Sequence, residues 1–278
     1  MCDDTPIPNE SGAGDYTLII SYEKKFVFIK LIKVAGSSVE NALSPFLGEK
    51  AIVTPMALEE ANDYWRVPWG KPKFFIKTWL SMLSRHKFKV IAFDLPFDIL
   101  HRRGPVRAHV FSPIGPHEGI QVAKSILAAE DFRDFLKVAV CRNPYEQIVS
   151  WYFWHLYLLK RRSDSSGFVE EPSFKEWFHA NTQKCGANYR ALTIDGKFAI
   201  DFVIRQEYLE EDLQVLCKRV DIDPIPVLEK LAREKLKTSS RPKDSSGLAK
   251  NLIDPESKIL IDILMDWDFR TFGYEKTL

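Results

Sequence analysis

The stretch from residue 26 to residue 43 decides the fold, and it reads FVFIKLIKVAGSSVENAL. Its first part, FVFIKLI at 26–32, is mostly β-branched or aromatic and does not alternate regularly with polar residues. Such a run is typical of a strand buried on both faces, as strands of a parallel sheet are. A turn of small residues and a helical pattern, SSVENAL, follow it. This order of strand, loop and helix predicts one unit of an α/β fold.

Two more units of the same kind follow along the chain. The buried runs KVAVC at 137–141 and FAIDFVI at 198–204 precede the helical patterns PYEQIVSWYFWHLYLLKRR at 144–162 and EYLEEDLQVLCKRV at 207–220. The sequence therefore predicts an α/β protein with a central parallel sheet flanked by helices. A possible strand, KVIAFD, occupies 89–94, and further helices are expected at 119–129, 172–180, 226–236 and 256–268.

The composition is that of an ordinary globular protein of 278 residues, with 45% hydrophobic and 28% charged residues. Polar sequence with proline and glycine at 1–15 predicts a disordered tail, and a single domain is expected over 16–278. The 39 basic and 38 acidic residues nearly cancel, which argues against wholesale binding of nucleic acid or of an anionic membrane. An anion-binding site must therefore be local.

Hydropathy and cysteine spacing indicate where the protein works. No apolar stretch approaches the ~20 residues that span a bilayer, and the opening MCDDTPIPNESGAG does not resemble a signal peptide. The four cysteines, at positions 2, 141, 185 and 217, form no CxxC pair, so neither a disulfide framework nor a zinc site is expected. We therefore expect reduced thiols, no stable membrane insertion and a cytoplasmic location.

The loop after the first predicted strand is suited to an anion. At the carboxyl end of a strand in an α/β sheet, a helix that begins there directs backbone N–H groups into the site. Gly36 permits close backbone approach, and Lys33 adds a positive charge. Ser37 and Glu40 have the spacing of a capping box. The lysine precedes a single glycine, so this is not the Walker A loop of ATP-binding proteins. The alternative is that the loop merely caps a helix and Lys33 is a solvated charge.

The loop after the second predicted strand repeats this logic. Arg142 ends the strand, Asn143 is expected to cap the next helix, and Pro144 suits its first position. Arginine offers a planar, always-charged fork that matches phosphate. Ser150 follows about two turns into the helix, where its hydroxyl can reach the same anion. The alternative pairs Arg142 with a carboxylate and hides Ser150 in helix packing.

Two anion loops together suggest a ligand with two separate phosphate groups, and at this point the sequence resembles a known family. It is similar to the sulfotransferases that use 3′-phosphoadenosine 5′-phosphosulfate (PAPS), in the branch of carbohydrate and other Golgi-type enzymes with bacterial relatives. The first loop resembles the family's 5′-phosphosulfate loop, K-x-A-G-[ST]-S, and the second its 3′-phosphate loop, R-[ND]-P-[YW]-x-x-x-x-S. The matching residues are Lys33, Ala35, Gly36, Ser37 and Ser38, and Arg142, Asn143, Pro144, Tyr145 and Ser150.

Two later stretches extend the resemblance. DFVIRQEYLEEDL at 201–213 is similar to the family's R-F-E-x-L-x-x-D segment, and MDWDFRTFGYE at 265–275 is similar to its closing D-[FY]-x-x-F-G-Y. One departure is Gln147, where relatives often carry arginine and where the local positive charge is therefore expected to be weaker. The region 45–115 has no match and is interpreted as a variable acceptor-side region. The resemblance implies the P-loop-like α/β fold of sulfotransferases.

The resemblance also implies the chemistry. A sulfuryl group passes by in-line displacement to a hydroxyl or amine of a small molecule or glycan, and adenosine 3′,5′-bisphosphate (PAP) is released. By analogy with phosphoryl transfer, the protein mainly aligns the reactants and stabilises the charge that develops on the leaving oxygen. Lys33, with the loop serines and the helix end, would do this, so no metal is required.

A general base is still needed, and histidine suits the role because its ordinary pKa of ~6.5 lies near working pH. Among the six histidines, His117 is preferred because its segment resembles a family element that precedes the 3′-phosphate strand. Glu118 and His109 stay open as alternatives. Arg241, in SSRPK at 239–243, is expected over the nucleotide, as the late loop is in similar enzymes.

Two other functions stay open. A nucleotide kinase or hydrolase is disfavoured by the missing Walker lysine and by the lack of a clear magnesium-binding carboxylate on a strand. A non-catalytic module that binds phosphorylated or sulfated ligands would keep the anion loops but lack a working base. Neither the acceptor nor the oligomeric state follows from the sequence.

Overall fold

The core of the computed structural model is a mixed five-stranded sheet. Its strand order is β3 (Ala51–Val53), β1 (Leu18–Ser21), β2 (Phe26–Ile29), β6 (Leu136–Cys141) and β9 (Phe202–Arg205). The structure describes residues 18–48, 50–53, 89–95, 106–112, 119–166, 170–184, 188–233 and 247–278.

The three runs predicted as buried strands lie next to one another in this sheet. β2 pairs with β6 and β6 pairs with β9, both in parallel, so that Phe28 is opposite Val138 and Val138 is opposite Phe202. Apart from Lys137 in β6 and Arg205 at the end of β9, these strands are apolar, as is typical of strands covered on both faces. The predicted parallel α/β sheet is therefore confirmed.

The other half of the sheet is antiparallel and was not expected from the sequence. β1 forms a hairpin with β2, in which Ser21 pairs with Phe26, and β3 adds antiparallel to the outer side of β1. The side chains of β1 are all buried. These short strands extend the sheet beyond the three parallel strands, β2, β6 and β9.

Helices connect and flank the strands. Among the described residues, KVIAFD belongs to β4 (Lys89–Leu95), which pairs antiparallel with β5 (Val106–Ser112), and β7 (Thr193–Ile194) pairs with β8 (Lys197–Phe198). Short 3-10 turns are η1 (Ser44–Phe46), η3 (Thr182–Lys184) and η4 (Gln206–Tyr208). The α-helices are α1 (Gly36–Leu43), α3 (Ile120–Ile126), α4 (Ala129–Asp134), α5 (Pro144–Ser166), α6 (Phe174–Asn181), α7 (Asn188–Leu192), α8 (Leu209–Arg219), α9 (Pro224–Arg233), α10 (Leu248–Leu252), α11 (Pro255–Leu264) and α12 (Asp266–Phe272).

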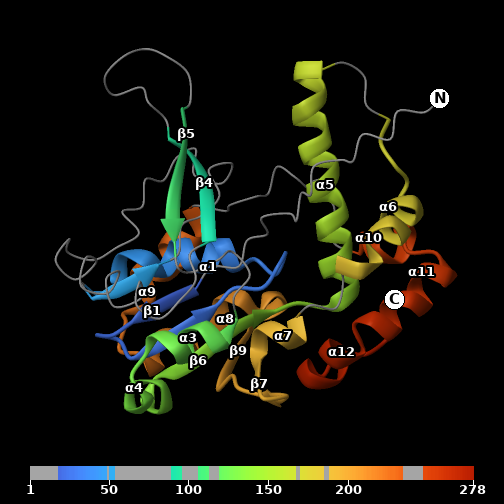
Figure 1. The fold of residues 1–278 in the computed structure, drawn as a ribbon. Coiled ribbons are helices and arrows are strands. Elements are labelled where there is room, and N and C mark those ends of the chain that lie inside the picture. The colour runs from blue at the N-terminus through green and yellow to red at the C-terminus, as the bar shows by residue number, and fades with distance from the viewer. Residues whose placement is uncertain are drawn as a thin grey trace.

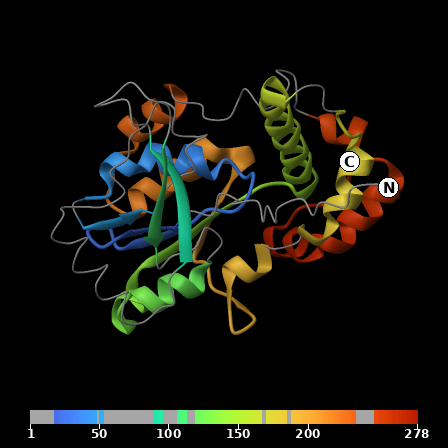
Figure 2. The same cartoon turned by 45° about the horizontal axis from the view of Figure 1, so that its top comes forward.

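The predicted helices are confirmed where the structure describes them, with two subdivisions, and the end of the one predicted at 226–236 lies outside the described residues. The segment predicted at 119–129 is divided between α3 and α4, and the one predicted at 256–268 between α11 and α12. In space, α1, α8 and α9 lie on one side of the sheet and α3 and α4 on the other (Figure 1, Figure 2). Helix α5 leaves the end of β6 and stands beside α6, α10, α11 and α12 (Figure 2).

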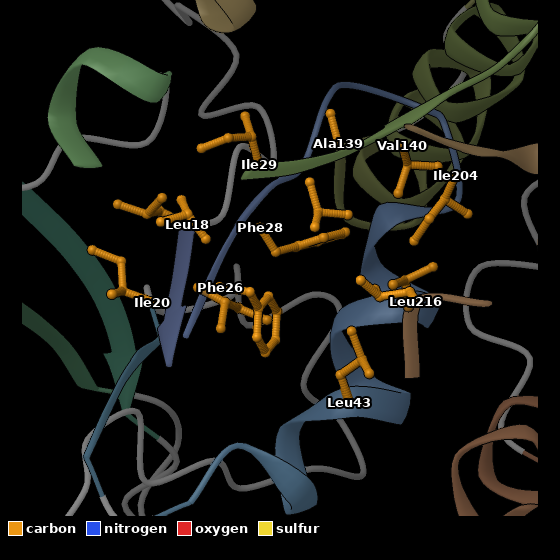
Figure 3. Packing of buried hydrophobic residues seen from close by; sticks show 14 of the residues in the cluster. Leu18, Ile20, Phe26, Phe28, Ile29, Leu43, Ala139, Val140, Ile204 and Leu216 are labelled. Atoms are coloured by element: carbon orange, nitrogen blue, oxygen red, sulfur yellow. The ribbon is translucent and has the colours of Figure 1, made fainter. Parts of the chain in front are cut away.

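One hydrophobic cluster fixes the sheet to its helices. Figure 3 shows Leu43 of α1 and Leu216 of α8 close to the strand side chains Val140 and Ile204, and all four are fully buried. Burial of a side chain of this size contributes about 1.5–3 kcal/mol. This cluster sets the position of α1, and therefore of the loop between β2 and α1.

A second cluster fixes α5. Its apolar side chains, which include Tyr145, Val149 and Leu156, are buried against α6 and the C-terminal helices. The Tyr145 ring lies 5.0 Å from the Phe269 ring of α12, and its hydroxyl hydrogen-bonds Asp262 of α11. The second predicted anion loop therefore rests on a packed base.

Candidate functional site

The two predicted anion loops lie side by side at one edge of the sheet. Parallel strands β2 and β6 are neighbours, with Ile29 opposite Ala139, so their carboxyl ends meet. From the second loop, Arg142 Nη1 donates a long hydrogen bond of 3.4 Å to the carbonyl oxygen of Lys33 in the first. Residues 109 positions apart in the chain thus meet at one place.

The N-terminus of α1 faces this place, but the predicted capping box is wrong. The helix begins at Gly36, and the N-cap is Ala35, which has a left-handed backbone (φ 67°) and accepts from the Ser38 amide at 3.0 Å. Alanine carries no capping oxygen, so no side chain of the N-cap competes with an anion for the first-turn amides. Ser37 is buried inside the helix rather than at its cap.

Glu40 does not reach back to the helix N-terminus, because its side chain is engaged elsewhere. Glu40 Oε2 lies 3.7 Å from the ammonium of Lys30, and both side chains are buried. A Cβ at Gly36 would lie 2.3 Å from Lys30 Cγ, so the glycine is needed where the lysine stem passes under the helix. The close approach predicted at Gly36 is therefore an approach to the protein's own side chain.

Lys33 is not a solvated charge. It is half-buried with a left-handed backbone (φ 59°), and its ammonium lies 4.4 Å from the centre of the Trp154 ring on α5. A cation over an aromatic face is held by about 0.5–2 kcal/mol. No sequence pattern predicts this contact, since Trp154 belongs to the helical pattern at 144–162, far along the chain from Lys33.

The second loop is built as predicted. Asn143 caps α5, because its Oδ1 accepts from the Tyr145 amide at 3.0 Å, and Pro144 is the first helical residue. Ser150 lies two turns into α5 and is buried. Arg142 and Asn143 thus have their predicted positions, while their roles toward a ligand stay predictions.

Arg142 also has the carboxylate partner that the alternative interpretation required. Its Nη2 lies 3.4 Å from Glu146 Oε2, one helical turn on, and the two side chains are only partly exposed. Sequence reasoning missed Glu146, although the spacing of four residues is a signal for such a pair. The Arg142 guanidinium therefore already has an anionic neighbour in the site.

The later motifs join the second loop. Glu207, in η4, accepts from the Asn143 amide at 2.7 Å and from the Tyr274 hydroxyl at 2.7 Å. That hydroxyl also lies 3.4 Å from Cys141 Sγ, at the end of β6. The strand-end, helix-start and C-terminal motifs of the predicted family are thus one hydrogen-bonded unit.

Burial and pairing shift the pKa of several groups in this unit. Burial raises the pKa of the Cys141 thiol to about 12, and burial, followed by Cys141 and Glu207, raises that of Tyr274. For Asp212, burial acts to raise the pKa, but hydrogen bonds from Arg205, with Nε and Nη2 each at 2.9 Å, outweigh it and lower the pKa. The Cys141 thiol and the Tyr274 hydroxyl therefore stay protonated at neutral pH.

Comparison with known proteins agrees with this geometry. A sequence model described as the sulfotransferase family matches residues 16–275. The chain belongs to the sulfotransferase family. No curated protein and no solved structure matches it. The sulfotransferase family and the α/β fold predicted from the motifs are confirmed, whereas the carbohydrate and Golgi-type branch and the PAPS donor stay predictions. The match includes 45–115, where no motif was recognised.

Some predicted site residues of this sulfotransferase lie outside the described part of the chain: His117, Glu118 and Arg241. His109 is on β5, opposite Ala92 of β4. Of the other histidines that the structure describes, His155 lies on α5 against Trp177 of α6. The identity of the general base therefore stays a prediction.

The described part of this sulfotransferase shows neither a cluster of metal ligands nor a membrane-spanning helix. Within these ranges, no group of three or more histidine, cysteine or carboxylate side chains is arranged to hold a metal ion. Within the same ranges, no helix combines the length and the apolar character needed to cross a membrane.

Proposed function

We propose that this sulfotransferase moves a sulfuryl group from PAPS to a hydroxyl or amine of a small molecule or glycan in the cytoplasm, and releases PAP. The observation that carries the proposal is the contact between Arg142 and the Lys33 carbonyl, at 3.4 Å. Because the two loops are adjacent, one nucleotide with phosphates at both ends of its ribose can engage both.

The residues present fit such a ligand. Around the 5′-phosphosulfate we assign Lys33, Ala35, Gly36, Ser37 and Ser38, where the α1 N-terminus carries no side-chain cap. Around the 3′-phosphate we assign Arg142 and Ser150, and Arg241 would cover the nucleotide. Glu146 takes part of the Arg142 charge in the ligand-free protein, and a doubly charged phosphate is the stronger partner for a guanidinium.

The chemical step needs a base, a charge stabiliser and alignment. PAPS supplies the sulfuryl group and a phosphate leaving group when bound. His117 is proposed to take the proton from the acceptor as the new bond forms between sulfur and the acceptor oxygen or nitrogen. Lys33, with backbone N–H groups of α1, is proposed to stabilise the negative charge left on the phosphate oxygen as the old S–O bond breaks. The Lys33–Trp154 contact keeps the ammonium at a defined place for this purpose.

The test compares ligands and then turnover. PAP should raise the melting temperature more than AMP or ATP at equal concentration, because it alone offers phosphates to both loops. Transfer of labelled sulfate from PAPS should then be found with a panel of hydroxyl and amine acceptors, and His117→Ala should abolish transfer while PAP still binds. Best stabilisation by ATP would favour a kinase-like enzyme. Stabilisation by PAP without transfer to any acceptor would favour a binding module.

A further inference from the structure

A chain of buried polar side chains leads from the C-terminal helices to the first loop. Gln147 Nε2 on α5 donates to the carbonyl oxygen of Ile32 at 2.7 Å. Asn188 Nδ2 on α7 donates to Gln147 Oε1 at 3.3 Å and to Asp268 Oδ1 on α12 at 2.6 Å. The side chains are almost inaccessible, with Gln147 5%, Asn188 4% and Asp268 2% exposed. The chain ends one residue before Lys33.

The carboxylate at the far end dictates the direction of every hydrogen bond. An ionised carboxylate only accepts, so Asn188 must turn its NH₂ group toward Asp268. The second hydrogen of that NH₂ group then meets an oxygen of Gln147, which leaves the Gln147 NH₂ group for the Ile32 carbonyl. A flipped Gln147 would place oxygen against oxygen. Burial raises the pKa of Asp268 to about 6, so the carboxylate is ionised at neutral pH.

The loop that this chain reaches has a backbone that needs support. Lys33 and Ala35 both have positive φ, at 59° and 67°, a region that side-chain-bearing residues adopt only when their surroundings hold them there. The second loop supplies two donors to the backbone just before α1. The bond from Arg142 is long at 3.4 Å, whereas the bond from Gln147 is 2.7 Å and comes from a buried residue. Gln147 is therefore the firmer of the two anchors.

We propose that Gln147, oriented by Asn188 and Asp268, is a positioning residue that holds the first loop in the conformation from which Lys33 serves sulfuryl transfer. This inference rests on the proposed function. A glutamine suits position 147 because its amide both donates and accepts: the NH₂ group donates to the Ile32 carbonyl, and the oxygen accepts from Asn188. Arginine has no acceptor and would break the chain at Asn188. Glutamine at position 147 is expected to give less positive charge near the nucleotide than arginine would. In exchange, its hydrogen bond to Ile32 holds the first loop in place.

Substitution of Gln147 by methionine tests the proposal, because methionine keeps the length but makes neither hydrogen bond. The matched control is Ser21→Ala. Ser21 Oγ also donates to a backbone carbonyl, that of Leu47 at 2.6 Å, and is fully buried, but it lies at the opposite edge of the sheet. Both variants are compared with wild type by hydrogen–deuterium exchange of the ligand-free amides at 33–39 and by steady-state kinetics, well below their melting temperatures.

We expect Gln147→Met to accelerate exchange at 33–39 and to lower kcat on the order of 10- to 100-fold, with a smaller change in the KM for PAPS, because a displaced Lys33 loop misaligns the reaction. Ser21→Ala should lower the melting temperature but leave exchange at 33–39 and kcat unchanged. Asp268→Asn, whose amide oxygen still accepts from Asn188, should keep kcat near the wild-type value, whereas Asp268→Leu should not.

Other results would overturn the inference. Wild-type exchange at 33–39 in Gln147→Met, or equal losses of kcat in Gln147→Met and Ser21→Ala, would mean that Gln147 has only a structural role. If Gln147→Met does not fold, Asn188→Ala replaces it and should show the same effects more weakly. Failure of the proposed function is distinguishable, because the wild-type protein itself would then neither bind PAP nor transfer sulfate, while the exchange comparison would still report on the loop.

Discussion

The ammonium of Lys33 lies 4.4 Å from the centre of the Trp154 ring, so the lysine that ends the first loop rests on the helix that follows the second. Trp154 itself stacks on Tyr157, with ring centres 5.3 Å apart. The long helix α5 thus contacts both loops. At its start, the Tyr145 amide donates to Asn143 and Glu146 pairs with Arg142 of the second loop. Further along, Trp154 contacts Lys33 of the first loop. Substitutions on α5 are expected to separate these two tasks.

Replacing Trp154 by leucine should lower kcat/KM by roughly 2- to 30-fold, the equivalent of a lost cation–π contact. Phenylalanine keeps an aromatic face and should retain most of the activity. The control is Trp151→Leu, since Trp151 packs edge-on against Trp177, with ring centres 6.2 Å apart. Steady-state kinetics with PAPS measure kcat/KM for the three variants and for wild type. Equal losses in Trp154→Leu and Trp151→Leu would show that only helix packing had been disturbed.

Breaking the Lys30–Glu40 pair should destabilise the protein strongly. Both side chains are buried, so Glu40→Gln leaves an ammonium without its carboxylate and should lower the free energy of unfolding by about 3–5 kcal/mol. The pair Lys175–Glu256 is closer, at 2.6 Å, but more than half exposed, so water screens it and Glu256→Gln should cost far less than Glu40→Gln. Urea unfolding of the two variants makes the comparison, and similar losses would contradict the buried role of Glu40.

The same ion pair explains why part of the first loop could not be predicted from the sequence. The spacing of Ser37 and Glu40 fits a capping box, which is a local pattern. The competing partner of Glu40 is Lys30, and only the fold shows that the lysine stem passes under Gly36. A tertiary ion pair therefore replaced the local cap, and the N-cap is Ala35.

What the sequence did predict follows from simple constraints. Continuous apolar runs occur where a strand is covered on both faces, and this identified β2, β6 and β9. Parallel neighbours share one edge, which is why Lys33 and Arg142 were expected to meet. By contrast, the partners Trp154, Asn188 and Asp268 come from separate helices. Their positions depend on packing, and no spacing in the chain reveals them.

Asp268 should make the stability of the protein fall as pH rises through the acid range. Its pKa in the folded protein, about 6, lies above its ordinary value of 3.8, so the folded state binds the proton more tightly than the unfolded state. The contribution of Asp268 to the free energy of unfolding is fully present below pH 3.8 and is lost as pH rises to about 6. The loss amounts to about 3 kcal/mol at 1.36 kcal/mol per pH unit over that interval.

The comparison with Asp268→Asn isolates this effect from other carboxylates. Asp212 and Asp254 have lowered pKa values, so they add stability as pH rises, in both proteins alike. The unfolding free energies of wild type and Asp268→Asn are measured by urea titration from pH 4 to pH 7. As pH rises over this range, wild type should lose stability relative to Asp268→Asn. A difference that does not change with pH would mean that Asp268 titrates normally.

The thiols of Cys141 and Cys217 should be unreactive in the folded protein. Burial raises their pKa values to about 12 and about 11, which leaves almost no thiolate at pH 8. In a variant with Cys2→Ser and Cys185→Ser, an aromatic disulfide reagent should find both thiols only after unfolding in urea. Rapid reaction of either thiol at pH 8 without denaturant would contradict their burial.

Replacing Glu146 by glutamine should tighten the binding of PAP. Glu146 lies 3.4 Å from Arg142 and would both compete with a phosphate for the guanidinium and repel it. A partly exposed ion pair of this kind is typically worth about 0.2–1 kcal/mol, so the Kd for PAP should fall by about 1.5- to fivefold. The matched control is Glu171→Gln, because Glu171 pairs at 3.1 Å with Lys160, far along the same helix. Calorimetry should show no change in the control. An unchanged or higher Kd in Glu146→Gln would mean that the phosphate does not engage Arg142, and the assignment of the second loop would fail.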